Sequence, residues 1–339
     1  MSRLRIAVLM GGRSSEHDIS LASGGSVIEA LQSRYDTVAV EIDREGRWAL
    51  PAAAPRELES AGDASPVETL PVPADSSVPA TLAEVDVVFP VLHGPFGEDG
   101  TVQGLLELAG VPYVGPGVLA SALCMDKDVF KAVLRDRGVP VTQSVTLRDG
   151  DPIEHPFPYP VFVKPARLGS SVGISKAHDE GELGVAVALA FRHDEKVLIE
   201  EFVDGLEVEC SVLGNRDPIA SQPGQIIAHA EWYDFSAKYE EGGMELIVPP
   251  PLPEETVELV RRLAVEAFVA GECEGMARVD FFVRGDEVLV NELNTIPGFT
   301  STSVYAKLFA ASGISYPELL DRLIALALER HARRQRYAY

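Results

Sequence analysis

Two segments in the last third of the chain carry polar residues that could hold a divalent cation. The segments 277–283 and 287–294 predict two antiparallel strands joined by a tight turn, with polar residues at alternate positions 278 and 280 of the first strand and 292 and 294 of the second. Because strand side chains alternate between the two faces, four polar residues share one surface of this hairpin. They are Arg278, Asp280, Glu292 and Asn294.

The register of the hairpin decides which of these residues face one another. A loop over 285–287 predicts that Arg284 pairs with Val288, and that Asp280 lies directly opposite Glu292. Carboxylates roughly 5 Å apart repel, which favours a bound cation, and a set of oxygen ligands is typical of Mg²⁺. The alternative is a solvated face on which the neighbouring arginine neutralises the acids.

The turn that follows the second strand predicts a site for an oxyanion. The run 294–303 contains a Pro-Gly pair and several hydroxyl groups. Gly298 lets the backbone approach a ligand closely, and its N–H together with Arg278 could stabilise a negatively charged oxygen. The alternative is a plain polar turn.

A lysine followed by a glycine- and serine-rich loop indicates a phosphate site. Lys164 lies on the predicted strand 160–165, and the loop 167–173 connects it to another strand. The backbone N–H groups of such a loop can bind phosphate oxygens when the loop lies over a nucleotide. Residues 197–203 would then form the adenine edge, and Glu207 could hold ribose hydroxyls. The alternative is a lone strand lysine that extends into water.

Two further polar residues are expected at the ligand side of an N-terminal sheet. The apolar runs 4–10 and 85–92 predict parallel strands that are buried on both faces. Glu16 and His93 follow these strands, at the edge where open α/β sheets bind ligands. By itself, Glu16 is also explained by the favourable field at the start of a helix.

The element pattern predicts three structural units. Residues 1–122 would form a βαβ unit in which a capping box at 15–18 begins the first helix and 111–114 forms a third strand. Residues 123–215 would form a central α+β unit, and residues 216–339 would contain the hairpin and the C-terminal helices.

Charge and composition exclude several classes of protein. There are 52 Asp and Glu residues against 29 Lys and Arg, and the resulting net charge of −23 repels nucleic acid. No apolar stretch reaches the roughly 20 residues of a membrane helix, and no signal segment is recognisable, so a cytoplasmic protein is expected. The basic run 330–336 is interpreted as a cationic helix end and a solvated tail.

Taken in order, these segments resemble the D-alanine:D-alanine ligases, a family with the ATP-grasp fold. The resemblance covers nearly the whole chain through GGRSSEHDISL, LHGPFGEDGTVQG, SALCMDK, VFVKPARLGSSVGISK, VLIEEFV, FSAKY, ARVDFF and NELNTIPGFTSTS. It implies an α/β and α+β architecture of three domains with an N-terminal parallel sheet. It also implies ATP and two Mg²⁺ (or Mn²⁺) ions as cofactors, and a homodimer as the assembly.

The resemblance also implies a role for each residue that matches a family motif. The residues near the two substrates and the tetrahedral centre would be Glu16, His93, Ser170, Tyr239, Arg278, Gly298 and Ser303. The residues around ATP would be Lys127, Lys164, Ser171, Glu200, Glu201, Val203, Glu207 and Lys238. The metal ligands would be Asp280, Glu292 and Asn294.

These roles imply a ligation in two steps. A carboxylate is a poor electrophile, so ATP would convert the first D-alanine into an acyl phosphate, which the amine of the second D-alanine attacks. A closing lid is needed because the intermediate hydrolyses in water, and 232–251 is expected to supply it. The product would be D-alanyl-D-alanine for peptidoglycan synthesis.

Three alternatives stay open. D-lactate or D-serine could be the second substrate: Val304–Ala306 departs from the family pattern, whereas Ala237–Tyr239 matches it and favours the dipeptide. A nucleotide-binding regulator without catalysis would have no need of the oxyanion-facing Arg278. The pattern G-x-G-x-x-A at 115–120 formally indicates a nicotinamide oxidoreductase, although Pro116 between the glycines speaks against it.

Overall fold

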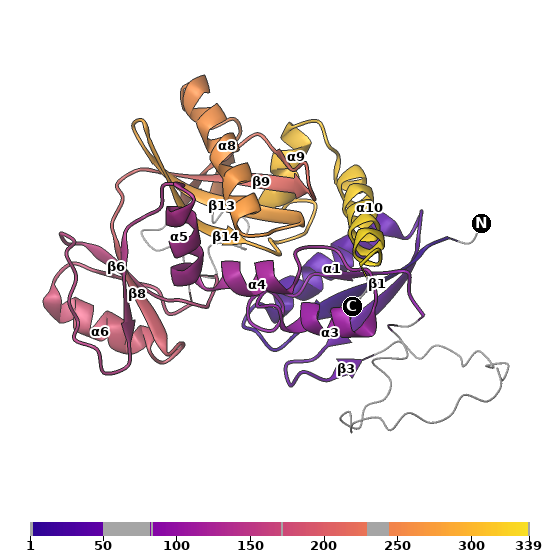
Figure 1. Ribbon diagram of the computed structural model, residues 1–339, viewed down its shortest axis with the longest axis horizontal. Helices are drawn as coiled ribbons and strands as arrows, with labels where there is room; N and C mark the ends of the chain where they lie inside the picture. The colour runs from indigo at the N-terminus through magenta and orange to yellow at the C-terminus, as the bar shows by residue number, and fades with distance from the viewer. Residues whose placement is uncertain (1–2, 50–81, 83, 171, 229–243, 338–339) are drawn as a thin grey trace.

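Three sheets follow one another along the chain, and helices cover them (Figure 1). The computed structural model describes residues 3–49, 82, 84–170, 172–228 and 244–337. The N-terminal and middle sheets lie at opposite ends of the molecule, and the C-terminal sheet lies between them. Mixed parallel and antiparallel pairing confirms the predicted α/β and α+β class. No helix within these ranges is long and apolar enough to cross a membrane.

The N-terminal sheet has a parallel centre, as predicted. Strand β1 (Arg5–Gly11) lies between β2 (Asp36–Ile42) and β4 (Val87–Pro90) and runs parallel to both. Strand β3 (Trp48–Ala49) pairs with β2 in the antiparallel direction. Helix α1 (His17–Leu31) connects β1 to β2 and packs against both strands, which completes the βαβ unit.

The segment 111–114 was predicted to be a third strand, and this prediction is wrong. It makes a single parallel bridge, between Val88 and Tyr113. The ladder stops there because Gly115 takes a φ of 93° and Pro116 has no N–H to donate. The helices on either side are α3 (Thr101–Ala109) and α4 (Val118–Met125).

The start of α1 also differs from the capping box predicted at 15–18. Glu16 is the N-cap residue, and its side chain makes no capping hydrogen bond. The hydroxyl of Ser14 instead accepts the backbone N–H of Glu16 at 3.2 Å. The carboxylate of Glu16 is therefore available for a contact elsewhere in the molecule.

The middle sheet is antiparallel throughout. Its order is β5 (Ser144–Arg148), β8 (Lys196–Glu201), β6 (Val161–Pro165) and β7 (Ser175–Ala177). Helix α6 (Glu180–Ala190) packs against β6 and β7, and the carboxylate of its N-cap residue Asp179 accepts a backbone N–H. Helix α5 (Lys127–Asp136) precedes this sheet in the chain.

The C-terminal sheet carries the predicted hairpin at one edge. Its order is β12 (Met244–Ile247), β11 (Gly224–Ala228), β9 (Leu206–Gly214), β13 (Gly275–Arg284) and β14 (Glu287–Asn294), with β10 (Ile219–Ala220) beside β9. Helix α8 (Glu254–Ala270) packs against β9, β13 and β14. Strand β9 thus pairs in this sheet, and the domain limits at 122/123 and 215/216 stay predictions.

At the site end of the hairpin, the pairing is as predicted. Asp280 pairs with Glu292, and Arg278 pairs with Asn294. The four polar residues therefore occupy neighbouring positions on two hydrogen-bonded strands.

At the turn end, the predicted register is wrong. Arg284 pairs with Glu287 rather than Val288, which leaves Gly285 and Asp286 as a two-residue turn. The φ of 60° at Gly285 suits such a turn. The site pairing nevertheless agrees with the prediction, because β14 contains a bulge that adds one residue between the turn and the site.

One hydrophobic core joins the N-terminal sheet to the C-terminal helices α9 (Val304–Ala311) and α10 (Tyr316–Arg334). Phe89 of the sheet, Tyr305 of α9 and Leu320 of α10 are fully buried in it. In Figure 1 the yellow α10 lies against the N-terminal unit. The two ends of the chain are thus packed together, which fixes the loops that follow β1 and β4.

The basic run at the end of α10 is not simply a solvated tail, contrary to the prediction. Arg330 is only 3% exposed. Its guanidinium donates to the carbonyls of Tyr113 and Gly115 and lies 4.3 Å from the Tyr113 ring centroid. Arg333 and Arg334 form ion pairs with acids of other segments. The arginines at the end of α10 therefore bind carbonyls and acids of other parts of the chain.

Candidate active site

A cavity of about 730 Å³ is lined by residues of all three sheets or of the loops that follow their strands. It brings together eight residues that were predicted from the sequence: Glu16, His93, Ser170, Arg278, Glu292, Asn294, Gly298 and Ser303. Three predicted residues, Ser171, Lys238 and Tyr239, lie outside the described residues, as does most of the expected lid.

The carboxylate of Glu16 is 6% exposed and accepts a hydrogen bond from the hydroxyl of Ser170. Ser170 belongs to the loop between β6 and β7 and has a φ of 52°, which is uncommon for a residue with a side chain. A Cβ atom at Gly94 would lie 2.8 Å from Glu16 Oε2, so glycine leaves room for the carboxylate. The contact ties the N-terminal unit to the middle sheet.

Arg278 lies between two carboxylates. Its Nε and Nη2 donate to the two oxygens of Asp280 at 2.7 Å each, and its Nε lies 2.9 Å from Glu209 Oε2. Asn294 also donates its Nδ2 to Asp280 at 2.9 Å. Such a bidentate pair fixes the plane of the guanidinium. Glu209 was not predicted from the sequence, because its place opposite Asp280 depends on the pairing of β9 with β13.

The three predicted metal ligands fit a hard cation by their chemistry. Asp280, Glu292 and Asn294 supply two carboxylates and an amide on adjacent positions of β13 and β14. The protein's own cations balance these acids: Arg278 pairs with Asp280, and Lys127 Nζ lies 3.2 Å from Glu292 Oε2. The described residues contain no group of three or more His, Cys, Asp or Glu side chains that could hold a metal, so this set depends on the amide.

A buried cluster of charges extends from the cavity toward the middle sheet. The carboxylate of Glu200 binds two ammonium groups, that of Lys131 through Oε1 and that of Lys164 through Oε2 at 2.5 Å. Lys131 is fully buried and also donates to the hydroxyl of Thr142. Glu200 therefore lies between two lysines in this structure.

Burial and neighbouring charge shift the pKa values of this cluster. Burial lowers the pKa of Lys131 to about 8, although the Glu200 carboxylate opposes the change. Burial opposes ionisation of Glu200, yet the two ammonium groups lower the pKa of its carboxyl. Lys131 was missed in the sequence, although it lies four residues after Lys127 on α5, the spacing that places two side chains on one helix face.

The bulge in β14 aims an additional side chain at this cluster. Asn291, the extra residue of the bulge, accepts a hydrogen bond from Lys164 Nζ at 3.1 Å. Its neighbour Glu292 contacts Lys127. Because of the bulge, two consecutive residues of β14 contact two different lysines, Asn291 with Lys164 and Glu292 with Lys127.

Three of the residues predicted for the adenine and the ribose lie at the end of β8 or after it. Glu201 accepts the backbone N–H of Gln143 at 2.8 Å, Val203 is buried, and Glu207 lies exposed on β9. None of the three lines the cavity described above. Their contacts with a nucleotide stay predictions.

The loop after β4 contributes two acid–base groups to the cavity wall. Burial lowers the pKa of His93, whose Nδ1 lies 2.9 Å from the carbonyl oxygen of Ile296. Burial and the nearby charge of Glu16 raise the pKa of Glu98 to about 8. Glu98 was missed as a site residue, although the sequence HGPFGEDG contains it and the loop was expected at the ligand edge.

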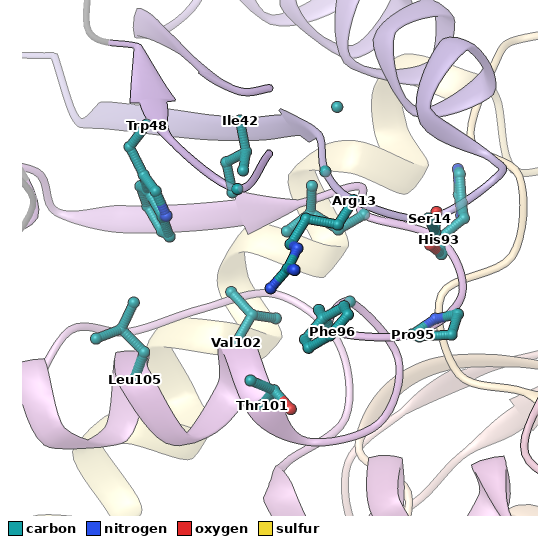
Figure 2. A pocket seen from close by; sticks show the side chains of 15 residues that line it. Arg13, Ser14, Ile42, Trp48, His93, Pro95, Phe96, Thr101, Val102 and Leu105 are labelled. Carbon is teal, nitrogen blue, oxygen red and sulfur yellow. Dashed lines mark hydrogen bonds between the residues drawn. The ribbon is translucent and has the colours of Figure 1, made fainter. Parts of the chain in front are cut away.

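The opposite side of the same loop forms a second, apolar pocket of about 200 Å³. Figure 2 shows the Arg13 side chain extending into it beside the Phe96 ring, with Ser14 and His93 at its edge. The guanidinium carbon lies 4.9 Å from the ring centroid. Trp48 and Leu105 complete the wall.

Ser303 lies beside the Pro-Gly turn. Its hydroxyl accepts the backbone N–H of Thr300 at 2.9 Å, and a Cβ atom at Gly298 would lie 3.4 Å from it. Val304 lines the cavity, whereas Tyr305 is fully buried and donates its hydroxyl to the carbonyl of Val212 at 3.0 Å. Ala306 is buried in the same core as Tyr305, so the segment 304–306 contains one cavity residue and two core residues.

Comparison with known proteins gives matches over both parts of the chain. The family described as D-ala D-ala ligase N-terminus matches residues 5–116, and that described as D-ala D-ala ligase C-terminus matches residues 133–325. The D-alanine–D-alanine ligase of Solibacter usitatus is 48% identical, with 98% of each chain covered. D-alanine–D-alanine ligase A of Escherichia coli K12 is 42% identical, again with 98% of each chain covered.

Solved structures agree in fold. The D-alanine-D-alanine ligase from Coxiella burnetii superposes with a TM-score of 0.82 at 37% identity and covers 99% of this chain and 97% of that one. The VanG D-Ala:D-Ser ligase from Enterococcus faecalis gives 0.80 at 33% identity, covering 96% and 100%. These matches confirm the ATP-grasp fold that the motifs implied. The chain belongs to the D-alanine–D-alanine ligase family of ATP-dependent ligases.

Proposed function

We propose that this protein joins two D-alanine molecules to D-alanyl-D-alanine at the expense of ATP, for the synthesis of peptidoglycan precursors. One observation carries the proposal. A single cavity contains a buried carboxylate suited to a substrate amine, a guanidinium and a backbone N–H suited to an oxyanion, and an acid, Glu292, in contact with Lys127. Relatives at 42–48% identity bear the name D-alanine–D-alanine ligase.

The first step activates the first D-alanine. Glu16, held by Ser170, would bind its ammonium group and turn its carboxylate toward the γ-phosphate of ATP. An oxygen of that carboxylate forms a bond to the γ-phosphorus while the bond to ADP breaks, giving an acyl phosphate. Lys127 and Lys164 would balance the phosphoryl charge, and both already contact carboxylates of the site. Ser171 and Lys238 are proposed to assist at the phosphates.

The second step forms the amide. The neutral amine of the second D-alanine attacks the acyl carbon, and the tetrahedral oxyanion would be stabilised by Arg278 and the N–H of Gly298. The oxyanion collapses, phosphate leaves, and the nitrogen loses its proton. Ser303 would hold the carboxylate of the second D-alanine, and Tyr239 would join the Glu16–Ser170 pair.

Asp280, Glu292 and Asn294 are proposed to hold two Mg²⁺ ions, or Mn²⁺. When bound, such ions supply charge neutralisation and alignment for the phosphoryl group. The protein's own contribution is to keep these oxygen ligands on paired positions of β13 and β14. Arg278 and Lys127, which now pair with the acids, would then be released toward the substrate and the phosphates.

The nucleotide is proposed to lie between the middle and C-terminal sheets. Glu200, Glu201, Val203 and Glu207 would line its adenine and ribose. In a related protein, a D-alanine–D-alanine ligase from Bacillus anthracis at 28% identity, the solved structure contains ATP. Residues 232–251 are proposed as the lid, and a homodimer in the cytoplasm as the working form.

The test is release of phosphate from ATP with Mg²⁺ and D-alanine, L-alanine or no amino acid, with the product identified by mass spectrometry. The expected result is release only with D-alanine and a dipeptide product. No phosphate release with D-alanine alone, but release after D-lactate or D-serine is added, would identify one of these compounds as the second substrate. No phosphate release under any of these conditions would overturn the proposed function.

A further inference from the structure

The backbone that flanks Gly298 is held by side chains from the N-terminal unit. The N–H of Ile296 donates to Glu98 Oε1 at 3.0 Å, and its carbonyl oxygen lies 2.9 Å from His93 Nδ1. The N–H of Phe299 donates to Ser23 Oγ at 3.2 Å. These bonds join segments that are 198 to 276 residues apart in the sequence.

The protons in this network can be assigned from its geometry. A carbonyl oxygen only accepts, so His93 Nδ1 must carry the proton that bonds to Ile296. In the neutral ring Nε2 is then an acceptor, and the hydroxyl of Ser23 donates to it at 3.2 Å. Hydrogen bonds therefore run without a break from the Phe299 N–H, through Ser23 and His93, to the Ile296 carbonyl.

This network leaves one N–H of the turn for the cavity. Pro297 has none, and those of Ile296 and Phe299 are bonded to side chains. The N–H of Gly298 has no hydrogen-bond partner among the described residues, and Gly298 lines the cavity. A donor left unpaired in a turn that is fixed on both sides is preorganised for an oxyanion.

The Glu98 side chain also binds the loop that carries it. Glu98 Oε2 accepts the N–H of Gly94 at 2.7 Å, so the side chain bridges the 92–100 loop and the Pro-Gly turn. Gly94 in turn packs against Glu16, the residue proposed for the amine of the first substrate. The amine site and the oxyanion donor are therefore fixed to one unit, and their separation is set by Glu98.

We propose that Ser23 and Glu98, which bind the turn together with His93, are positioning residues that aim the Gly298 N–H at the tetrahedral oxygen of the ligation. This role presupposes the ligation proposed above and assigns work to two residues that take no direct part in it. Neither is expected to touch the reacting atoms, because Ser23 bonds to the turn and to His93, and Glu98 bonds to the turn and to its own loop.

The test compares Ser23→Ala and Glu98→Gln in the full-length protein. Removal of an oxyanion donor typically costs ~10²–10³ in kcat, so a misplaced donor is expected to lower kcat by about 10- to 100-fold. The KM for ATP should change by less than about twofold, because the lysine cluster is untouched. Glu98→Gln keeps one acceptor oxygen but presents an amide to the other N–H, and Glu98→Ala should therefore be slower still.

Ser20→Ala is the matched control. Ser20 lies one turn earlier on α1, is fully buried, and bonds to the Gly11 N–H at 2.8 Å and the Val91 carbonyl at 2.6 Å. Its loss should lower the melting temperature about as much as Ser23→Ala does, with kcat nearly unchanged. A fall in kcat of the same size in Ser20→Ala would show that the effect is general destabilisation and would overturn the positioning role.

A second measurement separates positioning from structure. A phosphinate analogue of the D-alanine pair places an anionic oxygen where the tetrahedral oxygen would lie. Its affinity should fall in Ser23→Ala and Glu98→Gln by the same factor as kcat/KM, since both report the transition state. Unchanged kcat and analogue affinity in both variants would overturn this role alone. Wild-type protein without D-alanine-dependent turnover would overturn the proposed function, and this role with it.

Discussion

The loop 92–97 separates two hollows of opposite character. On one side lies the cavity of about 730 Å³, whose wall contains Glu16, Glu98 and Arg278. On the other side lies the pocket of about 200 Å³, whose wall is mostly apolar and contains one cation, Arg13, beside an aromatic ring. The same backbone thus borders a site built from paired charges and a site built from hydrophobic contact.

The difference between the two hollows shows that the shape of a pocket does not by itself identify the active site. The smaller, apolar pocket is well suited to an uncharged ligand, yet it offers no group that could activate a carboxylate. In the larger cavity Arg278 contacts two acids and Glu16 contacts a hydroxyl. Charged groups of this kind are costly to bury unless they are paired and hydrogen-bonded, and their gathering in one cavity indicates a site for a charged substrate.

The largest expected effect in this comparison comes from neutralising one acid of the proposed metal site, which lies at the cavity. Asp280→Asn or Glu292→Gln should lower kcat on the order of 10³-fold, because each removes a charge that aligns the phosphoryl group. The fold should persist, since both residues are only partly buried on paired strands. Turnover assays with circular dichroism spectra of each variant check this expectation. Near-normal activity in either variant would show that the metal assignment is wrong.

A substitution in the buried cluster of Lys131, Lys164 and Glu200 should lower the free energy of unfolding. Lys131→Met leaves Glu200 with one of its two ammonium partners in a buried site. Breaking a buried pair costs about 3–5 kcal/mol of unfolding free energy. Arg284→Met is the control, because its ion pair with Glu287 at 2.5 Å is about half exposed and should contribute less than about 1 kcal/mol. Equal urea midpoints for the two variants would contradict the expected difference.

Glu98, in the loop between the two hollows, should make the stability of the protein depend on pH. Burial and the Glu16 charge raise the pKa of Glu98 to about 8, above its ordinary value of 4.5. The folded state then binds more protons than the unfolded state between these values, so this contribution to stability is full below 4.5 and is lost as the pH rises through about 8. Glu98→Gln lacks this titration. Relative to the variant, the wild type should lose stability between pH 5 and pH 8 in urea unfolding, and parallel pH profiles would refute the shift.

Much of the cavity could be predicted from the sequence because its residues lie in short, patterned segments. The alternation of 277–294 located the acids and their pairing, and the apolar runs before Glu16 and His93 located the ligand edge. Contacts that depend on distant pairing could not be predicted. Glu209 faces Arg278 only because β9 pairs with β13, and the compensating bulge in β14 has no signal in the alternation.

Two predicted elements, the strand at 111–114 and the capping box at 15–18, are wrong for reasons that their local sequence pattern does not show. The segment 111–114 has the composition of a strand but ends at a positive-φ glycine and a proline, so only one bridge forms. The capping box at 15–18 requires Ser15 as the N-cap residue, yet Glu16 occupies that position and the carboxylate of Asp18 binds Arg44 instead. In both places a tertiary contact or a chain break outweighs a local preference.

The smallest effect is expected in the apolar pocket. Arg13→Ala removes a cation that contacts the Phe96 ring at 4.9 Å, an exposed contact that typically contributes about 0.5–1 kcal/mol. On its cavity side the 92–100 loop is held by hydrogen bonds of His93 and Glu98, and other bonds run within the loop and to Ser14 and Gln103. Because these bonds persist without Arg13, kcat and both KM values should stay within about twofold of the wild type, measured beside Glu98→Gln. A tenfold loss would mean that the loop's conformation depends on the apolar face, and that the two hollows are coupled through it.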